Sequence, residues 1–222
     1  AAVARLRIAL ASCQHYEQGE YVAHREIASR DLDLVLFVGD YVYESSNPRY
    51  RLRAHEGPAP VTLDAYRARH ATYKLDPDLR AAHAAHPWLL TWDDHEVEND
   101  YAGDASPSGL DTAAFLRRRA AAYQAWFEHL PVSPAMAPNG PAMRIHDRYR
   151  WGRLAELWTL DSSSGGWDHP MHIHFEEGQI IRSNGATISE TNRFRTDIYR
   201  LRQKIEPNPM QLRLLLTEVG GY

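Results

Sequence analysis

The feature that most constrains the fold is the stretch of residues 33–44, which reads Asp-Leu-Val-Leu-Phe-Val-Gly-Asp-Tyr-Val-Tyr-Glu. Residues 34–38 form a short, continuous apolar run of β-forming residues, which is typical of a strand buried on both faces of a sheet. The run stops at Gly39, and the carboxylate of Asp40 follows at once. In layered α/β folds, ligands and metals collect at the carboxyl ends of such strands. Asp40 and Tyr43 could therefore point at one ligand, although Gly-Asp is also common in ordinary turns.

Further strands and helices are expected around this one. Residues 3–11 alternate and then become wholly apolar, which predicts a first strand, and residues 20–28 have a helical pattern. Together with residues 34–38 they make a βαβ unit, whose crossover should be right-handed. Residues 88–92 predict a third buried strand, and helices are expected from Thr62, from Asp76-Pro77 and over residues 112–130. The predicted fold class is therefore α/β.

The sequence predicts a division of the chain near residue 161. Residues 143–149 and 154–160 indicate a hairpin around Trp151-Gly152, which completes a first domain of residues 1–161. A linker-like Ser-Ser-Ser-Gly-Gly tract follows, and the sequence then changes character. Residues 162–222 form a second, uncertain segment. It is expected to close with a helix over residues 209–219, with Gly220 just past its end.

Composition argues against several classes of protein. The 222 residues carry a formal net charge of −4, so a nucleic-acid-binding surface is not expected. The single cysteine, Cys13, rules out an internal disulfide framework. No apolar run approaches the ~18 residues of a membrane span. No signal peptide is recognisable, and a processed or trimmed start stays open.

Polar side chains follow all three predicted buried strands. Cys13 comes after the first strand, Asp40 and Tyr43 after the second, and the acidic run of residues 93–100 after the third. If the strands are neighbours, thiolate, carboxylate, phenolate and amide ligands converge at one place. They suit a hard, highly charged cation such as a ferric ion, which lowers the pKa of a thiol or phenol enough to bind it as an anion. One carboxylate can also bridge two metals, as in two-metal phosphoryl hydrolysis.

Several strings within residues 7–161 resemble the PhoD-like alkaline phosphatases of the calcineurin-like metallophosphoesterase superfamily. The strings are Ala-Ser-Cys-Gln at residues 11–14, Val-Gly-Asp-Tyr-Val-Tyr-Glu at 38–44, Trp-Asp-Asp-His-Glu-Val-Glu-Asn at 92–99, Arg-Arg-Ala-Ala-Ala-Tyr-Gln-Ala-Trp at 118–126 and Trp-Gly-Arg-Leu-Ala-Glu-Leu at 151–157. The string at 92–99 is the most specific. The resemblance implies a four-layer α/β/β/α sandwich. It also implies a secreted or periplasmic phosphomonoesterase or phosphodiesterase, which hydrolyses small phosphoesters with a metal-activated hydroxide.

The same resemblance implies an iron–calcium centre. Cys13, Asp40 and Tyr43 would hold Fe³⁺. Asp40 would also bridge to Ca²⁺, and Asn99 would be a ligand of the second metal.

The resemblance further assigns the catalytic pair. Asp94 and His95 stand where related enzymes carry Asn-His, so His95 would contact the phosphoryl group or give a proton to the leaving group. A structural role for His95 is the alternative. Family members are longer and carry further ligands in a later Gly-Asp-x-His-like segment, which has no counterpart after Asp161. An inactive remnant is therefore a rival interpretation.

A second resemblance lies in residues 168–185, which are similar to the third cupredoxin domain of multicopper oxidases. It implies that His169 binds a type 1 copper. His172 and His174 would serve the trinuclear cluster, and on a strand they would face opposite ways. The later His-Cys-His segment of that family is missing from this sequence. A copper-binding fragment is therefore the alternative function, and an exposed histidine-rich loop is the simpler interpretation. Two unrelated resemblances predict an incomplete or composite chain whose oligomeric state is open.

Overall fold

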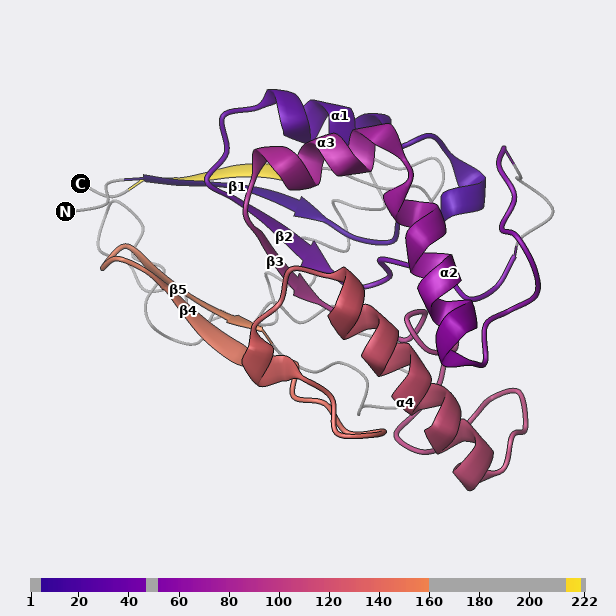
Figure 1. Cartoon of the computed structure of the whole chain (residues 1–222). Helices are drawn as coiled ribbons and strands as arrows, with labels where there is room; N and C mark the ends of the chain where they lie inside the picture. The colour runs from indigo at the N-terminus through magenta and orange to yellow at the C-terminus, as the bar shows by residue number, and fades with distance from the viewer. Residues whose placement is uncertain (1–4, 47–51, 160–214, 221–222) are drawn as a thin grey trace.

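A computed structural model describes residues 5–46 and 52–159, together with a strand at residues 215–220. Four strands form one sheet in the order β3-β2-β1-β6 (Figure 1). The strands are β1 (Arg5–Ala11), β2 (Leu34–Val38), β3 (Trp88–Thr91) and β6 (Leu215–Gly220). β1, β2 and β3 run parallel, whereas β6 pairs antiparallel with β1. The mixed α/β architecture and the three predicted buried strands are confirmed.

Helices connect and cover the parallel strands. They are α1 (Val22–Ser29), α2 (Leu63–Lys74), α3 (Pro77–Ala85) and α4 (Thr112–His129), with short 3₁₀ helices η1 (Tyr16–Gln18) and η3 (Pro134–Met136). Their N-termini lie where capping side chains stand in the sequence. Thr62 caps α2, Asp76 caps α3 ahead of a proline, and Asp111 caps α4, each by accepting hydrogen bonds from backbone N–H groups of the first turn. The predicted helices from Thr62, from Asp76-Pro77 and over 112–130 are therefore confirmed.

The two faces of the sheet are buried against different partners. Val35 and Phe37 of β2 point into the main core, which the helices complete. Leu34 and Leu36 alternate with them and point to the other face, where the β4–β5 hairpin packs through Leu157. The hairpin strands are β4 (Asp147–Trp151) and β5 (Ala155–Thr159), and Figure 1 shows them on the side of the sheet away from α1 and α3. Burial on both faces is what the continuous apolar run of residues 34–38 predicts.

An aromatic group joins the end of β3 to α4. The fully buried ring of Trp92 stacks on Tyr123, with ring centroids 4.1 Å apart and an interplanar angle of 11°. Trp126, one turn further along α4, meets Trp92 edge-on at 5.5 Å. These contacts fix the segment that directly precedes Asp93 and Asp94, so α4 helps to position the loop that follows β3.

The helix expected over residues 209–219 is wrong where the structure describes it. Residues 215–220 form β6, in register with β1 from Arg5 opposite Gly220 to Leu10 opposite Leu215. A short apolar run such as Leu-Leu-Leu at 214–216 fits a helix or a strand equally well by periodicity. The edge of β1 offers a full row of backbone hydrogen-bonding groups, and Thr217 and Val219 are β-branched. Both features favour a strand paired with β1 over a helix. The division at residue 161 stays a prediction, because residues 160–214 lie outside the described part of the chain.

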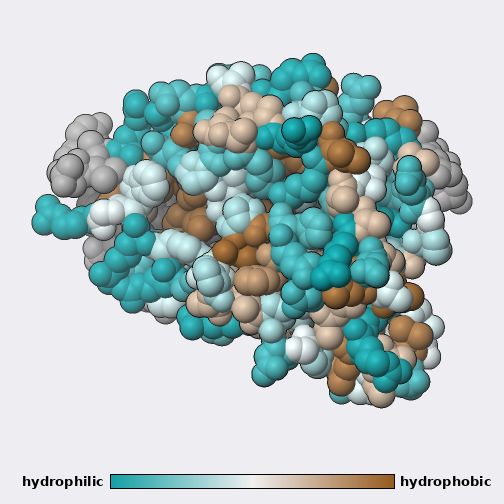
Figure 2. Space-filling model, in the orientation of Figure 1, coloured by the Kyte–Doolittle hydropathy of each residue, from teal (hydrophilic) through white to brown (hydrophobic). Residues whose placement is uncertain are grey.

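The surface is mixed in polarity, as the composition of the chain leads us to expect. The face in Figure 2 mixes hydrophilic and hydrophobic residues, and the hydrophobic ones lie in small groups rather than one broad patch. Among the described residues, no helix combines the length and apolar character that crossing a membrane requires.

Gly39, at the end of β2, is the tightest backbone position described. Its φ of +93° is one that side-chain-bearing residues rarely adopt. A Cβ at this position would lie 2.6 Å from the Cβ of Asp93 and 2.8 Å from its backbone nitrogen. The loops after β2 and β3 can therefore approach this closely only because residue 39 has no side chain.

We expect Gly39→Ala to lower the free energy of unfolding by at least about 3 kcal/mol, because backbone strain and overpacking add. Gly109 is the matched control, since its φ is +79° but nothing lies within 4 Å of an added Cβ. Gly109→Ala should cost only the strain of the left-handed conformation, about 1 kcal/mol. Urea unfolding of both variants measures the difference, and equal costs would show that the close approach is unimportant.

Candidate metal centre

The carboxyl ends of β1, β2 and β3 lie at one edge of the sheet, as parallel pairing requires. Backbone bonds continue past the strands: the N–H of Cys13 donates to the carbonyl of Gly39 at 3.2 Å, and that of Gln14 to the carbonyl of Asp40 at 3.1 Å. Cys13 and Asp40 both adopt left-handed conformations, with φ of 59° and 57°. Such values are rare for residues other than glycine and gather at functional sites.

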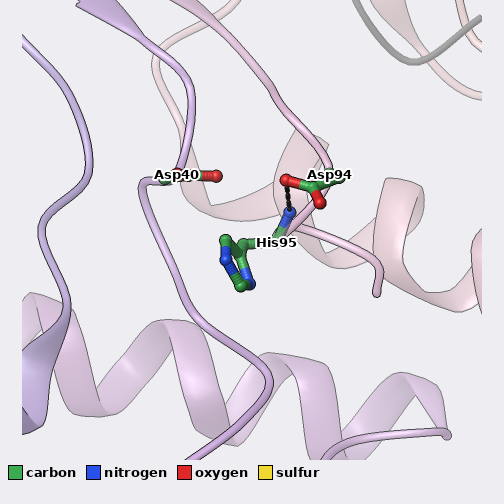
Figure 3. A group of neighbouring side chains, drawn as sticks. All are labelled: Asp40, Asp94 and His95. Carbon is green, nitrogen blue, oxygen red and sulfur yellow. Dashed lines mark hydrogen bonds between the residues drawn. The ribbon is translucent and has the colours of Figure 1, made fainter. Parts of the chain in front are cut away.

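Asp40, Asp94 and His95 converge at this edge. Each offers one potential ligand atom, and these atoms all lie within 4.8 Å of one another. Figure 3 shows the two carboxylates facing a common space, with the imidazole ring of His95 beside it. Asp40 is only 7% exposed and Asp94 only 5%. Two buried carboxylates so close together repel each other unless a positive charge lies between them.

The carboxyl group of Asp40 is incompletely satisfied by the described protein atoms. Its Oδ2 accepts a hydrogen bond from the Tyr43 hydroxyl at 3.0 Å, but its Oδ1 is buried and has no hydrogen-bond partner among the described residues. Burial raises the pKa of Asp40; the positive charge of His95 opposes this, and the negative charge of Asp94 adds to it. A buried, unpartnered carboxylate oxygen is costly, and a cation is the partner that would offset the cost.

Glu96 holds the two acidic loops together. Its buried carboxylate accepts hydrogen bonds from the backbone N–H groups of Asp40 at 3.2 Å, Tyr41 at 2.5 Å and Asp93 at 2.8 Å. The first two donors follow β2 and the third follows β3. One side chain therefore fixes the relative position of the segments that carry Asp40 and Asp94.

His95 is oriented by Glu44. The Nδ1 atom of His95 lies 2.8 Å from Oε2 of Glu44, and the other oxygen of Glu44 accepts from the backbone N–H of Asn99 at 3.2 Å. Burial works to lower the pKa of His95, but the hydrogen bond to Glu44 and the charges of Asp40 and Asp94 outweigh it and raise that pKa to about 10. Burial also disfavours an ionised Glu44, yet the bond to His95 keeps its pKa below the ordinary value. The pair is a carboxylate–imidazolium ion pair.

Tyr43 lies between two imidazole rings. Its ring centroid is 4.1 Å from that of His95 and 4.4 Å from that of His15. Burial raises the pKa of Tyr43 well above its usual value, and the charge of Asp40 adds to this. The backbone around it is anchored to α2, since Arg69 donates hydrogen bonds to the carbonyls of Tyr43 and Glu44. The phenol is therefore held rigidly with its hydroxyl on Asp40.

The structure separates the predicted site residues into an inner and an outer set. A hydrogen bond from Cys13 partly opposes the burial that raises the pKa of Asp40, so Cys13 belongs with Asp40 and Tyr43. Asn99 is exposed, and its side-chain amide donates to Asp100 Oδ2 at 2.6 Å. Asp94, which is predicted as catalytic, lies beside Asp40 and His95 and so belongs to the inner set. The copper-type residues His169, His172 and His174 lie outside the described residues.

Sequence reasoning assigned no role to Glu44, Glu96 or His15. Glu44 and Glu96 stand inside the strings at 38–44 and 92–99, so their presence was visible, but a sequence does not say which side chains of a loop turn inward. For Glu96 a signal was present in the sequence. It is a further acid just after Asp93 and Asp94 at a strand end, where backbone N–H groups that are no longer paired in the sheet need acceptors. His15 directly follows the Ser-Cys-Gln string and carried no such signal.

The donor set fits a metal centre. It offers carboxylate oxygens from Asp40 and Asp94, a phenol from Tyr43 and a thiol from Cys13, which together suit hard cations of high charge. The orphaned Oδ1 of Asp40 is the observation in this structure that supports the fit. Phosphoryl transfer is the chemistry for which two cations near a shared carboxylate are best suited.

Comparison with known proteins gives two matches that each cover most of this chain. Alkaline phosphatase D of Bacillus subtilis (strain 168) is 46% identical over 165 residues, which cover 72% of this chain and 28% of that protein. A solved structure described as that of PhoD superposes with a TM-score of 0.70 at 46% identity and covers 73% of this chain and 32% of the solved one. The chain thus spans about a third or less of the length of the relatives it matches.

The family comparison agrees with the motifs. The family described as PhoD-like phosphatase matches residues 8–192, which is well over half of the chain and includes both acidic loops. The match also runs through residues 168–185, the stretch predicted from its motifs to resemble cupredoxins. The resemblance drawn from the strings at 11–14, 38–44 and 92–99 is confirmed, and the chain belongs to the PhoD-like phosphatase family.

Proposed function

We propose that this chain carries part of the active site of a metal-dependent phosphoester hydrolase, an alkaline phosphatase or phosphodiesterase that acts on small phosphoesters. The observation that carries the proposal is the buried pair of Asp40 and Asp94, in which Asp40 Oδ1 has no hydrogen-bond partner among the described residues. Family membership and the similarity to alkaline phosphatase D support the reaction class. The proposal includes further ligands from outside the described residues.

The proposed cations are Fe³⁺ and Ca²⁺. Cys13, Asp40 and Tyr43 would hold the ferric ion, because a thiol and a phenol bind this ion well as anions. Asp40 would be shared with the calcium ion. A carboxylate oxygen of Asp94 lies within 4.8 Å of one of Asp40 and would join Asn99, the second-metal ligand that the family resemblance implies. Bound cations would neutralise charge on the phosphoryl oxygens and acidify water.

His95 would manage the proton of the leaving group. Its Nδ1 is occupied by Glu44, so Nε2 is the ring nitrogen left to meet a substrate. A protonated Nε2 would donate to a phosphoryl oxygen or to the departing oxygen. The buried Glu44 keeps the ring oriented, so that this proton is presented in a fixed direction.

Two wider features complete the proposal. The four-layer α/β/β/α sandwich is proposed for the longer protein, and the β4–β5 hairpin supports it because it covers the sheet face opposite the helices. A secreted or periplasmic location is proposed from the family resemblance.

We expect the purified 222-residue chain to bind iron and calcium through the ligands that it does carry. Elemental analysis measures both, and a p-nitrophenyl phosphate assay with and without chelator measures turnover. Chelator should remove the metals and any hydrolysis together, because the carboxylates alone repel a phosphate. Copper in place of iron and calcium would favour the alternative based on residues 169–174.

Asp40→Asn should reduce iron and calcium retention by more than about tenfold, since loss of a direct ligand costs more than loss of an outer-shell partner. The control is Asp111→Asn, which removes the same charge at an exposed helix cap where asparagine serves equally well. Metal content after dialysis is the readout. Retention of both metals by Asp40→Asn would remove Asp40 from the centre.

Metal-free stability distinguishes a functional from a structural role for Asp40. Folding raises the pKa of Asp40, so the protonated form of this carboxyl group contributes its whole stabilising effect below the unfolded pKa. That effect is lost as pH rises through the folded pKa, because the buried group must then ionise. At pH 8 in chelator, Asp40→Asn should therefore unfold at the same urea concentration as the wild type or a higher one. With metal at about 100 times its Kd, the wild type should gain about 2.7 kcal/mol. A less stable Asp40→Asn in chelator would indicate a structural role.

A further inference from the structure

A cavity of about 430 Å³ lies away from the metal centre. It is bounded by Lys74 at the end of α2, His83 of α3, the start of β3 and residues 128–131 at the end of α4. Figure 1 shows α3 leading into β3 and α4 ending close to the same strand in this view. None of Asp40, Asp94 or His95 lines the cavity, so it is a separate site. Its volume is within the range of small-molecule pockets.

Lys74 gives the cavity a positive charge that the described residues do not neutralise. The ammonium group forms no ion pair or hydrogen bond with them, and it lies 5.7 Å from the ring centroid of Tyr41. Burial lowers the pKa of Lys74 to about 8. A half-buried ammonium without a counter-ion favours an anion beside it.

The one carboxylate in the cavity wall is already engaged. Glu128 accepts hydrogen bonds from Arg67 at 2.7 and 2.8 Å and from Gln124 at 2.8 Å. The bond from Arg67 holds the pKa of Glu128 down at about 2. Its charge is therefore balanced outside the cavity and leaves that of Lys74 available.

The histidines of the cavity do not form a metal site. His83 Nε2 lies 2.8 Å from the Tyr41 hydroxyl, His86 Nε2 lies 2.9 Å from the carbonyl of Ile27, and His129 Nδ1 lies 2.8 Å from the carbonyl of Ala125. One nitrogen of each ring is thus committed to the protein, and the described residues give no cluster of ligand atoms here. The remaining wall is apolar, with Pro87, Leu130 and Pro131.

We propose that this cavity binds a small organic oxyanion. Its phosphate, phosphonate or carboxylate group contacts Lys74, and its apolar part packs against Leu130 and Pro131. An inorganic anion would use only the charge, whereas the volume and the apolar wall favour a ligand that also has a hydrocarbon body. The site is independent of the phosphoester hydrolysis proposed above.

The test uses the 222-residue chain in chelator, so that no metal centre competes for the anion. Phenylphosphonate, benzoate and inorganic phosphate are titrated by calorimetry into the wild type and into Lys74→Met, Lys74→Arg and Arg80→Met. Methionine keeps the apolar stem of Lys74 and removes the charge. Arg80 is exposed on α3 and does not line the cavity, so Arg80→Met controls for net charge.

We expect phenylphosphonate or benzoate to bind the wild type with a Kd on the order of 1 mM, and inorganic phosphate to bind more weakly. Lys74→Met should weaken binding at least about tenfold, whereas Lys74→Arg and Arg80→Met should stay within about threefold. The tighter of the two organic ligands identifies the anionic group. Circular dichroism checks that each variant is folded.

A second readout assigns binding to Lys74 directly. The chain has two lysines, Lys74 and Lys204, so ¹³C reductive methylation gives few signals, and that of Lys74 is the one lost in Lys74→Met. Its chemical shift should move saturably with phenylphosphonate and not with sodium chloride at equal ionic strength. Equal shifts with both, equal binding by Lys74→Met, or equal affinity for inorganic phosphate would each overturn the proposal.

Discussion

The three hydrogen bonds accepted by Glu96 are the constraint on which the functional edge of the sheet depends. They tie the backbone of Asp40 and Tyr41 to that of Asp93, and so join the segments after β2 and β3. Loops normally owe their shape to their own turns, but here a buried carboxylate replaces missing sheet bonds beyond the last paired residues. Without these three hydrogen bonds, repulsion between the carboxylates of Asp40 and Asp94 would separate the two segments. The geometry of a candidate cation site is thus set by a residue that is not one of its candidate ligands.

This edge concentrates features that oppose folding. Cys13 and Asp40 have left-handed backbones, and Asp40 is buried beside a second acid. The opposing contribution comes from the aromatic packing of Trp92 on α4 and from the two-sided burial of β2. A rigid apolar scaffold that carries a strained polar edge is the usual trade between stability and function.

Much of this arrangement was predictable from local patterns. The apolar run at 34–38, the capping side chains before three helices and the polar side chains after the three parallel strands all act over a few residues, and the structure contains them as predicted. Two features were not predictable because they depend on distant partners. Residues 215–220 are a strand only because β1 has an open edge. Asp94 lies beside Asp40 because the backbone turns after Asp94, whose carbonyl accepts from the N–H groups of Val97 and Glu98. Spacing alone did not reveal that turn.

The pairing of β1 with β6 has a consequence for how the protein assembles. β1 comes from residues 5–11 and its edge partner from residues 215–220, so this pairing has one of the longest sequence separations that the chain allows. Long-range strand pairing is slow, because loop-closure entropy is lost before any contact forms. Until residues 215–220 pair with it, β1 keeps one open edge, and open edges recruit other chains. The strand order therefore leaves this sheet exposed to mispairing until β6 is in place.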